Sequence, residues 1–154
     1  MNRFIRRVRQ MLSRRMLAGM SAPLLTLAML VGLPGTASAS AAASPNVGYN
    51  GKCGSGYNVV NWKDTQFGRG TVYVTWSSAA QKNCVVAIRA TQDGSIYELG
   101  AWVGYSGQGW YDQDFGMYQY YAGPVYLPGA SGRCIDWRGE IGATYASGEG
   151  TNCG

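Results

Sequence analysis

The chain has 154 residues, a formal net charge of +5, four cysteines and no histidine. The lack of histidine excludes Ser-His-Asp and Cys-His catalytic systems and most catalytic metal sites that use histidine ligands. Six of the 13 basic residues precede Ser40 and all eight acidic residues follow it, so the remainder has a net charge of −1 and lacks the basic surface of a nucleic-acid-binding protein.

Residues 1–39 have the three parts of a secretory signal peptide. An arginine-rich start is followed by an apolar run over residues 16–33 and by an A-x-A cleavage site at Ala37-Ser38-Ala39. The run is short for a transmembrane helix and contains glycine, serine and proline. We therefore predict a secreted, extracellular protein whose mature form has no transmembrane segment. Arg14-Arg15 leaves the twin-arginine route open, although general secretion suits a cystine-stabilised domain better.

The rest of the chain divides into a leader and one domain. Residues 40–50 contain Ala, Ser and Pro with little to bury, which predicts a flexible leader. Residues 51–154 alternate short β-branched and aromatic runs with glycine-rich turns, which predicts a single β-domain. The expected strands cover residues 58–62, 71–76, 84–91, 95–103, 110–115, 117–121, 125–127, 133–137 and 143–145.

The spacing of these strands predicts the fold class. In the cleanest of them Val72, Val74 and Trp76 share one face and the intervening polar and tyrosine residues share the other. Asp93-Gly94 is typical of a hairpin turn. No helical periodicity lasts for three turns, so we expect an all-β fold, a small antiparallel β-sandwich or barrel stabilised by two disulfides.

The disulfides are expected from Cys53, Cys84, Cys134 and Cys153. An even number of cysteines in a small secreted chain predicts two bridges, for which three pairings exist. We predict sequential pairing, Cys53–Cys84 and Cys134–Cys153, because it closes the shorter loops, with Cα atoms about 4.4–6.8 Å apart. Each bridge should add on the order of 3 kcal/mol to stability. The cysteines lack zinc-ligand spacing, and no metal or other cofactor is expected.

Four carboxylates are candidates for catalytic residues. Asp112 and Asp114 would point to the same side of a strand, whereas Asp136 and Glu140 flank Trp137. Glycosidases use two carboxylates about 5–10 Å apart across a cleft, and neighbouring aspartates can also bind calcium. A chain this short has little mass for a deep cleft. We therefore assign no catalytic residue and expect the four acids to be mostly solvated, with no two converging in a pocket.

Tryptophan and tyrosine are the other candidate functional residues. We expect Trp76, Trp102 and Trp137 to belong to the core, with Trp76 buried. Exposed rings could instead stack on the sugars of cell-wall polysaccharide, and alternation predicts that Tyr118 and Tyr120 are more exposed than Met117 and Tyr121. The candidate ligand-binding residues are Trp110, Tyr111, Tyr118 and Tyr120.

Several motifs of the domain are distinctive. They are Cys53-Gly54-Ser55-Gly56-Tyr57, Thr71-Val72-Tyr73, Asn83-Cys84-Val85-Val86, Tyr120-Tyr121-Ala122-Gly123-Pro124-Val125, Cys134 with Trp137-Arg138-Gly139, and Asn152-Cys153-Gly154. Together they resemble the spore-associated protein A family of Streptomyces and related actinobacteria. The resemblance implies a small secreted protein of the spore or the outer surface of aerial hyphae, and it supplies no catalytic residue.

Four hypotheses on function follow. The first is a secreted, non-enzymatic protein that adheres to the spore or cell-wall surface. The second is a carbohydrate-binding module that uses exposed tyrosine and tryptophan rings on polysaccharide. The third is a small hydrolase that uses the candidate acids. The fourth, a protease inhibitor, lacks a recognisable reactive-site loop. Nucleic acid is not an expected partner, and the sequence does not define the oligomeric state.

Overall fold

The computed structural model describes residues 43–154, so the predicted signal peptide, residues 1–39, lies outside the described residues. The described chain forms strands because its β-branched and aromatic runs are short and are separated by turns. The strands are β1 (Asn58–Asp64), β2 (Gly70–Ser77), β3 (Lys82–Arg89), β4 (Tyr97–Tyr105), β5 (Asp112–Tyr118), β6 (Tyr121–Pro128), β7 (Ile135–Ile141) and β8 (Thr144–Thr151). A short 3₁₀ turn, η1 (Gln66–Gly68), joins β1 to β2.

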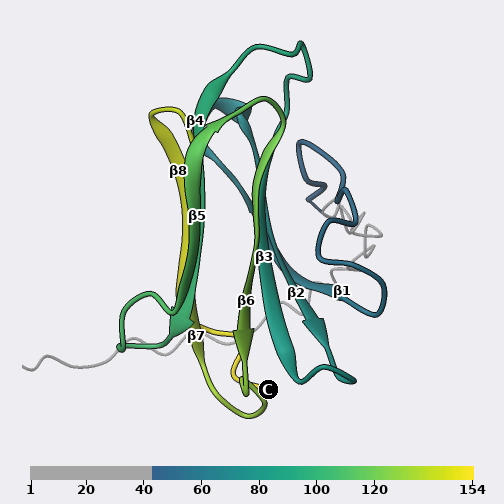
Figure 1. The fold of residues 1–154 in the computed structure, drawn as a ribbon, viewed down its shortest axis with the longest axis vertical. Helices are drawn as coiled ribbons and strands as arrows, with labels where there is room; N and C mark the ends of the chain where they lie inside the picture. The colour runs from purple at the N-terminus through teal and green to yellow at the C-terminus, as the bar shows by residue number, and fades with distance from the viewer. Residues whose placement is uncertain (1–42) are drawn as a thin grey trace, which may run out of the picture. The chain divides into compact units, whose positions relative to one another are not determined.

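The strands form two antiparallel sheets of four strands each. The first sheet has the order β1-β2-β3-β6 and the second has the order β5-β4-β7-β8. Figure 1 shows the two sheets face to face, with β5 opposite β6. Val72 and Val74 of the first sheet and Leu99, Val103 and Trp137 of the second belong to one buried apolar core between them. The predicted all-β sandwich is therefore confirmed. The hairpin expected at Asp93-Gly94, with residues 95–103 as the partner strand of residues 84–91, is wrong, because β3 and β4 belong to different sheets.

The alternation expected in β2 is also confirmed, with one correction. Val72 and Val74 face the core, whereas Tyr73 lies on the outer side of the first sheet. There it belongs to a second apolar cluster, whose buried members are Cys53, Tyr73, Cys84, Val86 and Ile88. Trp76 is only partly buried and packs against the core, because it lies near the end of β2. Our expectation that Trp76 is buried was therefore too strong.

The second apolar cluster is covered by the chain that precedes β1. Figure 1 shows this segment, in blue, on the outer side of the first sheet. Val47 and Tyr49 pack against the cluster, and the Tyr73 hydroxyl donates a hydrogen bond to the Val47 carbonyl oxygen at 2.5 Å. Val47 and Tyr49, which we expected in a flexible leader over residues 40–50, instead supply apolar surface that the first sheet buries.

Both predicted disulfides are present, Cys53–Cys84 and Cys134–Cys153. The first fastens the segment before β1 to β3, within the second apolar cluster. The second joins the residue before β7 to the end of the chain after β8. The Cα atoms lie 6.0 Å apart in the first bridge, as expected, but 3.9 Å apart in the second, where the chain turns at Asn152 with a positive φ of 53°.

One strand was divided wrongly by the sequence pattern. We expected separate strands over residues 110–115 and 117–121, but β5 runs without a break from Asp112 to Tyr118, and the chain then turns into β6. Asp112, Asp114 and Tyr118 therefore share the inner side of β5, whereas Met117 points outward and is 64% exposed. The expectation that Tyr118 is more exposed than Met117 is wrong for this reason.

Candidate functional site

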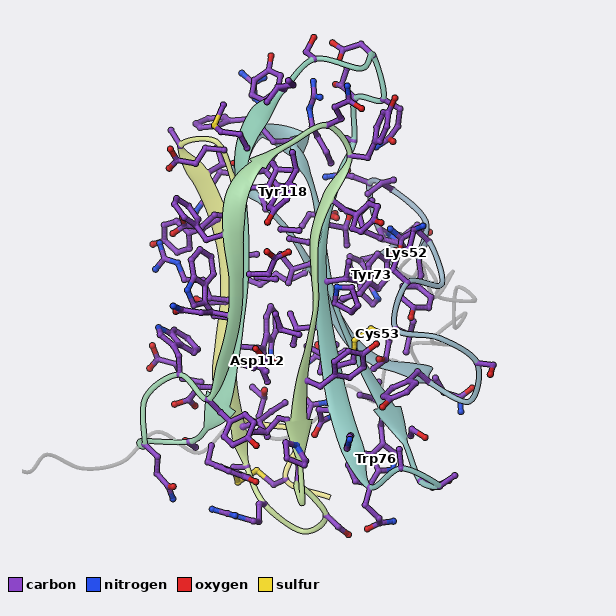
Figure 2. All side chains as sticks on the ribbon, in the orientation of Figure 1. Lys52, Cys53, Tyr73, Trp76, Asp112 and Tyr118 are labelled. Carbon is purple, nitrogen blue, oxygen red and sulfur yellow. A yellow bond between two sulfur atoms is a disulfide. The ribbon has the colours of Figure 1, made fainter. Side chains whose placement is uncertain are left out.

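The paired aspartates of β5 lie on the seam between the two sheets, where β5 faces β6. The carboxylate of Asp112 accepts a hydrogen bond from the backbone N–H of Tyr126 at 2.7 Å. Asp114 accepts one from the backbone N–H of Gly123 at 2.7 Å and another from the Tyr118 hydroxyl at 2.5 Å. Figure 2 shows Asp112 and Tyr118 between β5 and β6. The two carboxylates thus accept hydrogen bonds from backbone N–H groups of β6, which belongs to the other sheet, and so connect β5 to β6.

The hydrogen bond from Tyr118 to Asp114 changes the properties of the phenol. The Asp114 carboxylate, as hydrogen-bond acceptor, raises the pKa of Tyr118, and burial and the nearby charge act in the same direction. Tyr118 therefore remains a hydrogen-bond donor at neutral pH. Asp114 is only partly exposed and accepts two hydrogen bonds, so it is not the mostly solvated acid that we expected.

The other two candidate acids also have structural partners. Asp136 accepts hydrogen bonds from the backbone N–H groups of Gly107 at 3.0 Å and Gly150 at 2.7 Å, which ties the β4–β5 loop to β8. Burial raises the pKa of Asp136, but the hydrogen bonds from Gly150, Gly107 and Ser106 together outweigh it and leave the pKa lowered. Glu140 forms an ion pair with Arg138 at 2.5 Å. Each candidate acid is therefore engaged by a neighbour.

The four predicted ligand-binding residues do not form one surface. Trp110 and Tyr111 are exposed in the loop between β4 and β5, where the Tyr111 ring lies 6.0 Å from that of Tyr105. Tyr120 is exposed in the turn after β5, at the opposite end of that strand. Seven residues of extended chain span about 20 Å, so these two groups are far apart.

Tyrosine side chains do surround the turn from β5 to β6. Tyr118, Tyr120 and Tyr121 line a shallow cavity of about 300 Å³ together with Asp114. Tyr120 and Tyr121 also line a neighbouring cavity of about 330 Å³ beneath the segment that precedes β1, where the Lys52 ammonium lies 5.0 Å from the centre of the Tyr121 ring. Two of the predicted residues, Tyr118 and Tyr120, are therefore brought together here.

A more extended array of rings lies on the outer side of the second sheet. Because Ala101 and Val103 of β4 face the core, Trp102 faces away from it, and the expectation that Trp102 belongs to the core is wrong. A Cβ atom at Gly100 would lie 2.0 Å from the Trp102 ring, so the indole occupies the space above this glycine. The Phe115 ring lies 5.7 Å from that of Trp102 and is 52% exposed.

Charged and aromatic side chains continue this array across β7 and β8. Arg138 is paired with Trp102 in the register of β4 and β7, and its guanidinium lies 4.3 Å from the centre of the Tyr145 ring. Glu140 is paired with Tyr145 in the register of β7 and β8 and neutralises Arg138. We call Trp102, Phe115, Arg138, Glu140 and Tyr145 the outer aromatic face. Figure 2 shows ring side chains on this outer side, away from β6.

The comparison with curated proteins bears on the identity of the chain. The chain is 44% identical over 126 residues to Spore-associated protein A of Streptomyces coelicolor (strain ATCC BAA-471 / A3(2) / M145). The aligned residues cover 82% of this chain and 79% of the relative. The chain belongs to the spore-associated protein A family. The resemblance inferred from the sequence motifs is thereby confirmed, and association with spores is the property that the relative's name carries.

The family motifs map onto the parts of the fold that hold it together. Cys53 and Cys84 form the first disulfide, and Gly123 lies at the seam with Asp114.

No model of a protein family and no solved structure matches the chain. Among residues 43–154 there is no helix with the length and hydropathy of a membrane span. Nor does that part of the chain gather three acidic, histidine or cysteine side chains that could share a metal ion.

The outer aromatic face was missed in the sequence, although part of its signal was present. Because Ala101 and Val103 are apolar and face the core, alternation along β4 places Trp102 on the opposite, outer face. The apolar residues Ile135, Trp137 and Ile141 of β7 place Arg138 and Glu140 on the outer face in the same way. The pairing of β5 with β4 was not accessible, and without it Phe115 could not be placed beside Trp102.

Proposed function

We propose that this member of the spore-associated protein A family is exported, has no enzymatic activity, and adheres to the spore or cell envelope by binding polysaccharide with its outer aromatic face. The observation that carries the proposal is the position of Trp102 above Gly100 with Phe115 beside it. The name of the Streptomyces coelicolor relative supports the location.

The geometry of the outer aromatic face suits a sugar chain. Strands lie about 4.8 Å apart, so a row of residues across four strands extends roughly 14 Å. Trp102 and Phe115 lie side by side at one end of this row, and Arg138 and Tyr145 lie at the other. Sugar rings present C–H groups that pack on aromatic faces, while their hydroxyls hydrogen-bond to charged groups such as Arg138 and Glu140. Because this ion pair carries no net charge, the face complements a neutral polysaccharide.

The environments of the candidate acids support a non-enzymatic role. A general acid or base needs a carboxyl group that is free to reach a substrate. Instead, Asp112 and Asp114 hold β5 to β6, Asp136 holds the β4–β5 loop to β8, and Glu140 pairs with Arg138. Using Asp112, Asp114 or Asp136 in catalysis would require the loss of a hydrogen bond that the fold uses, and the charge of Glu140 is already paired with Arg138.

Adhesion is tested by incubating the purified protein with insoluble peptidoglycan, chitin and cellulose and measuring how much protein sediments with each. We expect Trp102→Ala and Phe115→Ala to lower retention on at least one material while the melting temperature changes little, because both side chains lie on the outer side of the sheet. Trp110→Ala, an equally large exposed ring in the β4–β5 loop, is the matched control and should leave retention unchanged.

The outcomes separate the parts of the proposal. No retention on any material, or equal retention of Trp102→Ala and the parent protein, would reject the outer aromatic face as the polysaccharide site. Product released from glycoside or peptide substrates, and lost in Asp112→Asn or Asp114→Asn variants that remain folded, would reject the non-enzymatic role. Fractionation of sporulating cultures tests the location independently of both.

A further inference from the structure

A separate cleft of about 320 Å³ lies at the end of the sandwich where β3 ends and β4 begins. Arg69, directly before β2, and Arg89, the last residue of β3, line it on one side. Tyr97 and the turn from β7 to β8, which includes Gly142 and Thr144, line it from the second sheet. The cleft is therefore lined by two arginines, and neither of them belongs to the outer aromatic face.

Arg89 is held rigidly in this cleft although it is only 4% exposed. Its guanidinium donates hydrogen bonds to the carbonyl oxygens of Ser95 at 2.8 Å and Gln119 at 2.9 Å, and to the Asp93 carboxylate at 2.9 Å. It also lies 4.0 Å from the centre of the Tyr97 ring. These hydrogen bonds use three of the five N–H donors of an arginine, so donors remain for a ligand and little side-chain entropy would be lost on binding.

The charge of the cleft is positive. Asp93 is its one lining acid, and it is already paired with Arg89. The backbone N–H of Ser95 lowers the pKa of Asp93, and Arg89 lowers it further, so Asp93 stays ionised at neutral pH. Arg69 is exposed, and within residues 43–154 no carboxylate lies within ion-pair distance of it. Two arginines and one aspartate leave one positive charge unbalanced.

We propose that this cleft binds an oxyanion, the carboxylate or phosphate of a small molecule or of an acidic envelope polymer, with the hydrogen-bonded Arg89 and the exposed Arg69 as its two guanidinium donors. Guanidinium groups recognise carboxylate and phosphate oxygens with paired hydrogen bonds, more strongly than neutral donors do. The hydroxyl of Thr91 adds a donor on the same rim. The site does not depend on polysaccharide binding by the outer aromatic face.

The test is an NMR titration of the purified protein with inorganic phosphate and galacturonate, with uncharged galactose as the matched control. We expect saturable shifts at the amides of Thr91, Tyr97 and Thr144 with both anions and none with galactose. Arg69→Gln should weaken anion binding about fivefold or more, and added salt should weaken it in the parent protein. Arg133→Gln removes an exposed guanidinium at the other end of β4, above Tyr105, and should have no effect.

The remaining variants make the result decisive. Trp102→Ala should retain full anion binding, which distinguishes failure of this cleft from failure of the outer aromatic face. Co-sedimentation with insoluble polygalacturonate, compared with a neutral galactan, identifies a polymer as the source of the anion, whereas binding of the small anions alone identifies a free ligand. The absence of saturable shifts, or equal affinity in Arg69→Gln and the parent protein, would overturn the proposal.

Discussion

Asp114 Oδ2 lies 2.7 Å from the backbone nitrogen of Gly123, across the seam where β5 of one sheet faces β6 of the other. Gly123 has a φ of 88°, and a Cβ atom there would lie 2.7 Å from the Val85 carbonyl oxygen, so only glycine fits this position without strain. A carboxylate on one strand and a glycine on the other thus close one side of the sandwich.

Removal of this carboxylate should destabilise the fold. Asp114→Ala leaves the Gly123 N–H and the Tyr118 hydroxyl without their acceptor, and we expect the free energy of unfolding to fall by about 2 kcal/mol, as is usual for hydrogen bonds to charged groups. Urea unfolding measures the change. Glu149→Gln, on an exposed residue of β8, is the control and should lie within about 0.5 kcal/mol of the parent protein. Equal stability of the two variants would contradict a structural role for Asp114.

The pKa of Asp136 predicts a pH-dependent contribution to stability. Its folded-state pKa lies below the ordinary value of 3.8, so its contribution is present above that value and is lost as pH falls through the folded-state pKa. Asp136→Asn can satisfy only one of the two N–H groups of Gly107 and Gly150. We therefore expect the parent protein to exceed this variant in stability by a constant amount from pH 5 to 7, and the gap to narrow below about pH 4.

This prediction is tested by measuring the free energy of unfolding of the parent protein and of Asp136→Asn from pH 2 to pH 7. A gap that stays the same down to pH 2 would mean that ionisation of Asp136 does not contribute. Asp93→Asn serves as a comparison, because Asp93 also has a lowered pKa but lies in the loop between β3 and β4 rather than in β7.

The two disulfides should differ in their effect on stability. By loop length alone each bridge adds about 3–4 kcal/mol. Cys53 and Cys84 are buried in the second apolar cluster and also hold the segment before β1 against the first sheet, whereas Cys153 is exposed. We therefore expect the Cys53→Ser/Cys84→Ser double variant to lose more stability than Cys134→Ser/Cys153→Ser.

Thermal unfolding of the two double variants measures this order. Non-reducing peptide mapping of the parent protein should recover the two sequential pairs and no free thiol. A peptide that links Cys53 to Cys134 or Cys153 would refute the pairing, and equal melting temperatures of the double variants would refute the proposed role of the first bridge.

The fold could be predicted because its signals are local. Alternation along residues 71–76 and the loop lengths between cysteines required no knowledge of the partner strands, and both predictions are confirmed. The seam and the outer aromatic face depend on contacts between strands. Asp112 and Asp114 gain their partners only because β6 lies opposite β5, and Phe115 meets Trp102 only through the register of β4 with β5.

The same distinction explains the misplaced tyrosine. Tyr118 and Met117 are adjacent in one strand, so alternation places them on opposite faces but does not say which of them faces inward. The polar start of β5 obscured this assignment, since aspartates that face inward on a strand are uncommon unless a partner satisfies them. Val47 and Tyr49 were assigned to a flexible leader for a related reason, because the apolar surface that they cover lies on β2 and β3.

Substitutions of Gly100 and Gly139 test the role of the outer aromatic face more directly. They lie in adjacent strands, and alanine at either position would clash, but with different partners. A Cβ at Gly100 would lie 2.0 Å from the outer ring of Trp102, whereas a Cβ at Gly139 would lie 2.4 Å from Val72 in the core. Neither glycine has a positive φ, so the backbone accepts alanine at both positions. Gly100→Ala should therefore displace the indole, whereas Gly139→Ala should disturb core packing.

We expect Gly139→Ala to lose about 1–3 kcal/mol of stability, as overpacked core substitutions do. Gly100→Ala should lose less than Gly139→Ala, because the ring of Trp102 can swing outward into solvent, yet it should lower retention on insoluble polysaccharide as much as Trp102→Ala does. Urea unfolding and co-sedimentation of the same two variants separate these effects. If Gly100→Ala is retained as well as the parent protein while its tryptophan fluorescence shows that the indole has moved, the position of Trp102 above Gly100 does not form the polysaccharide-binding surface.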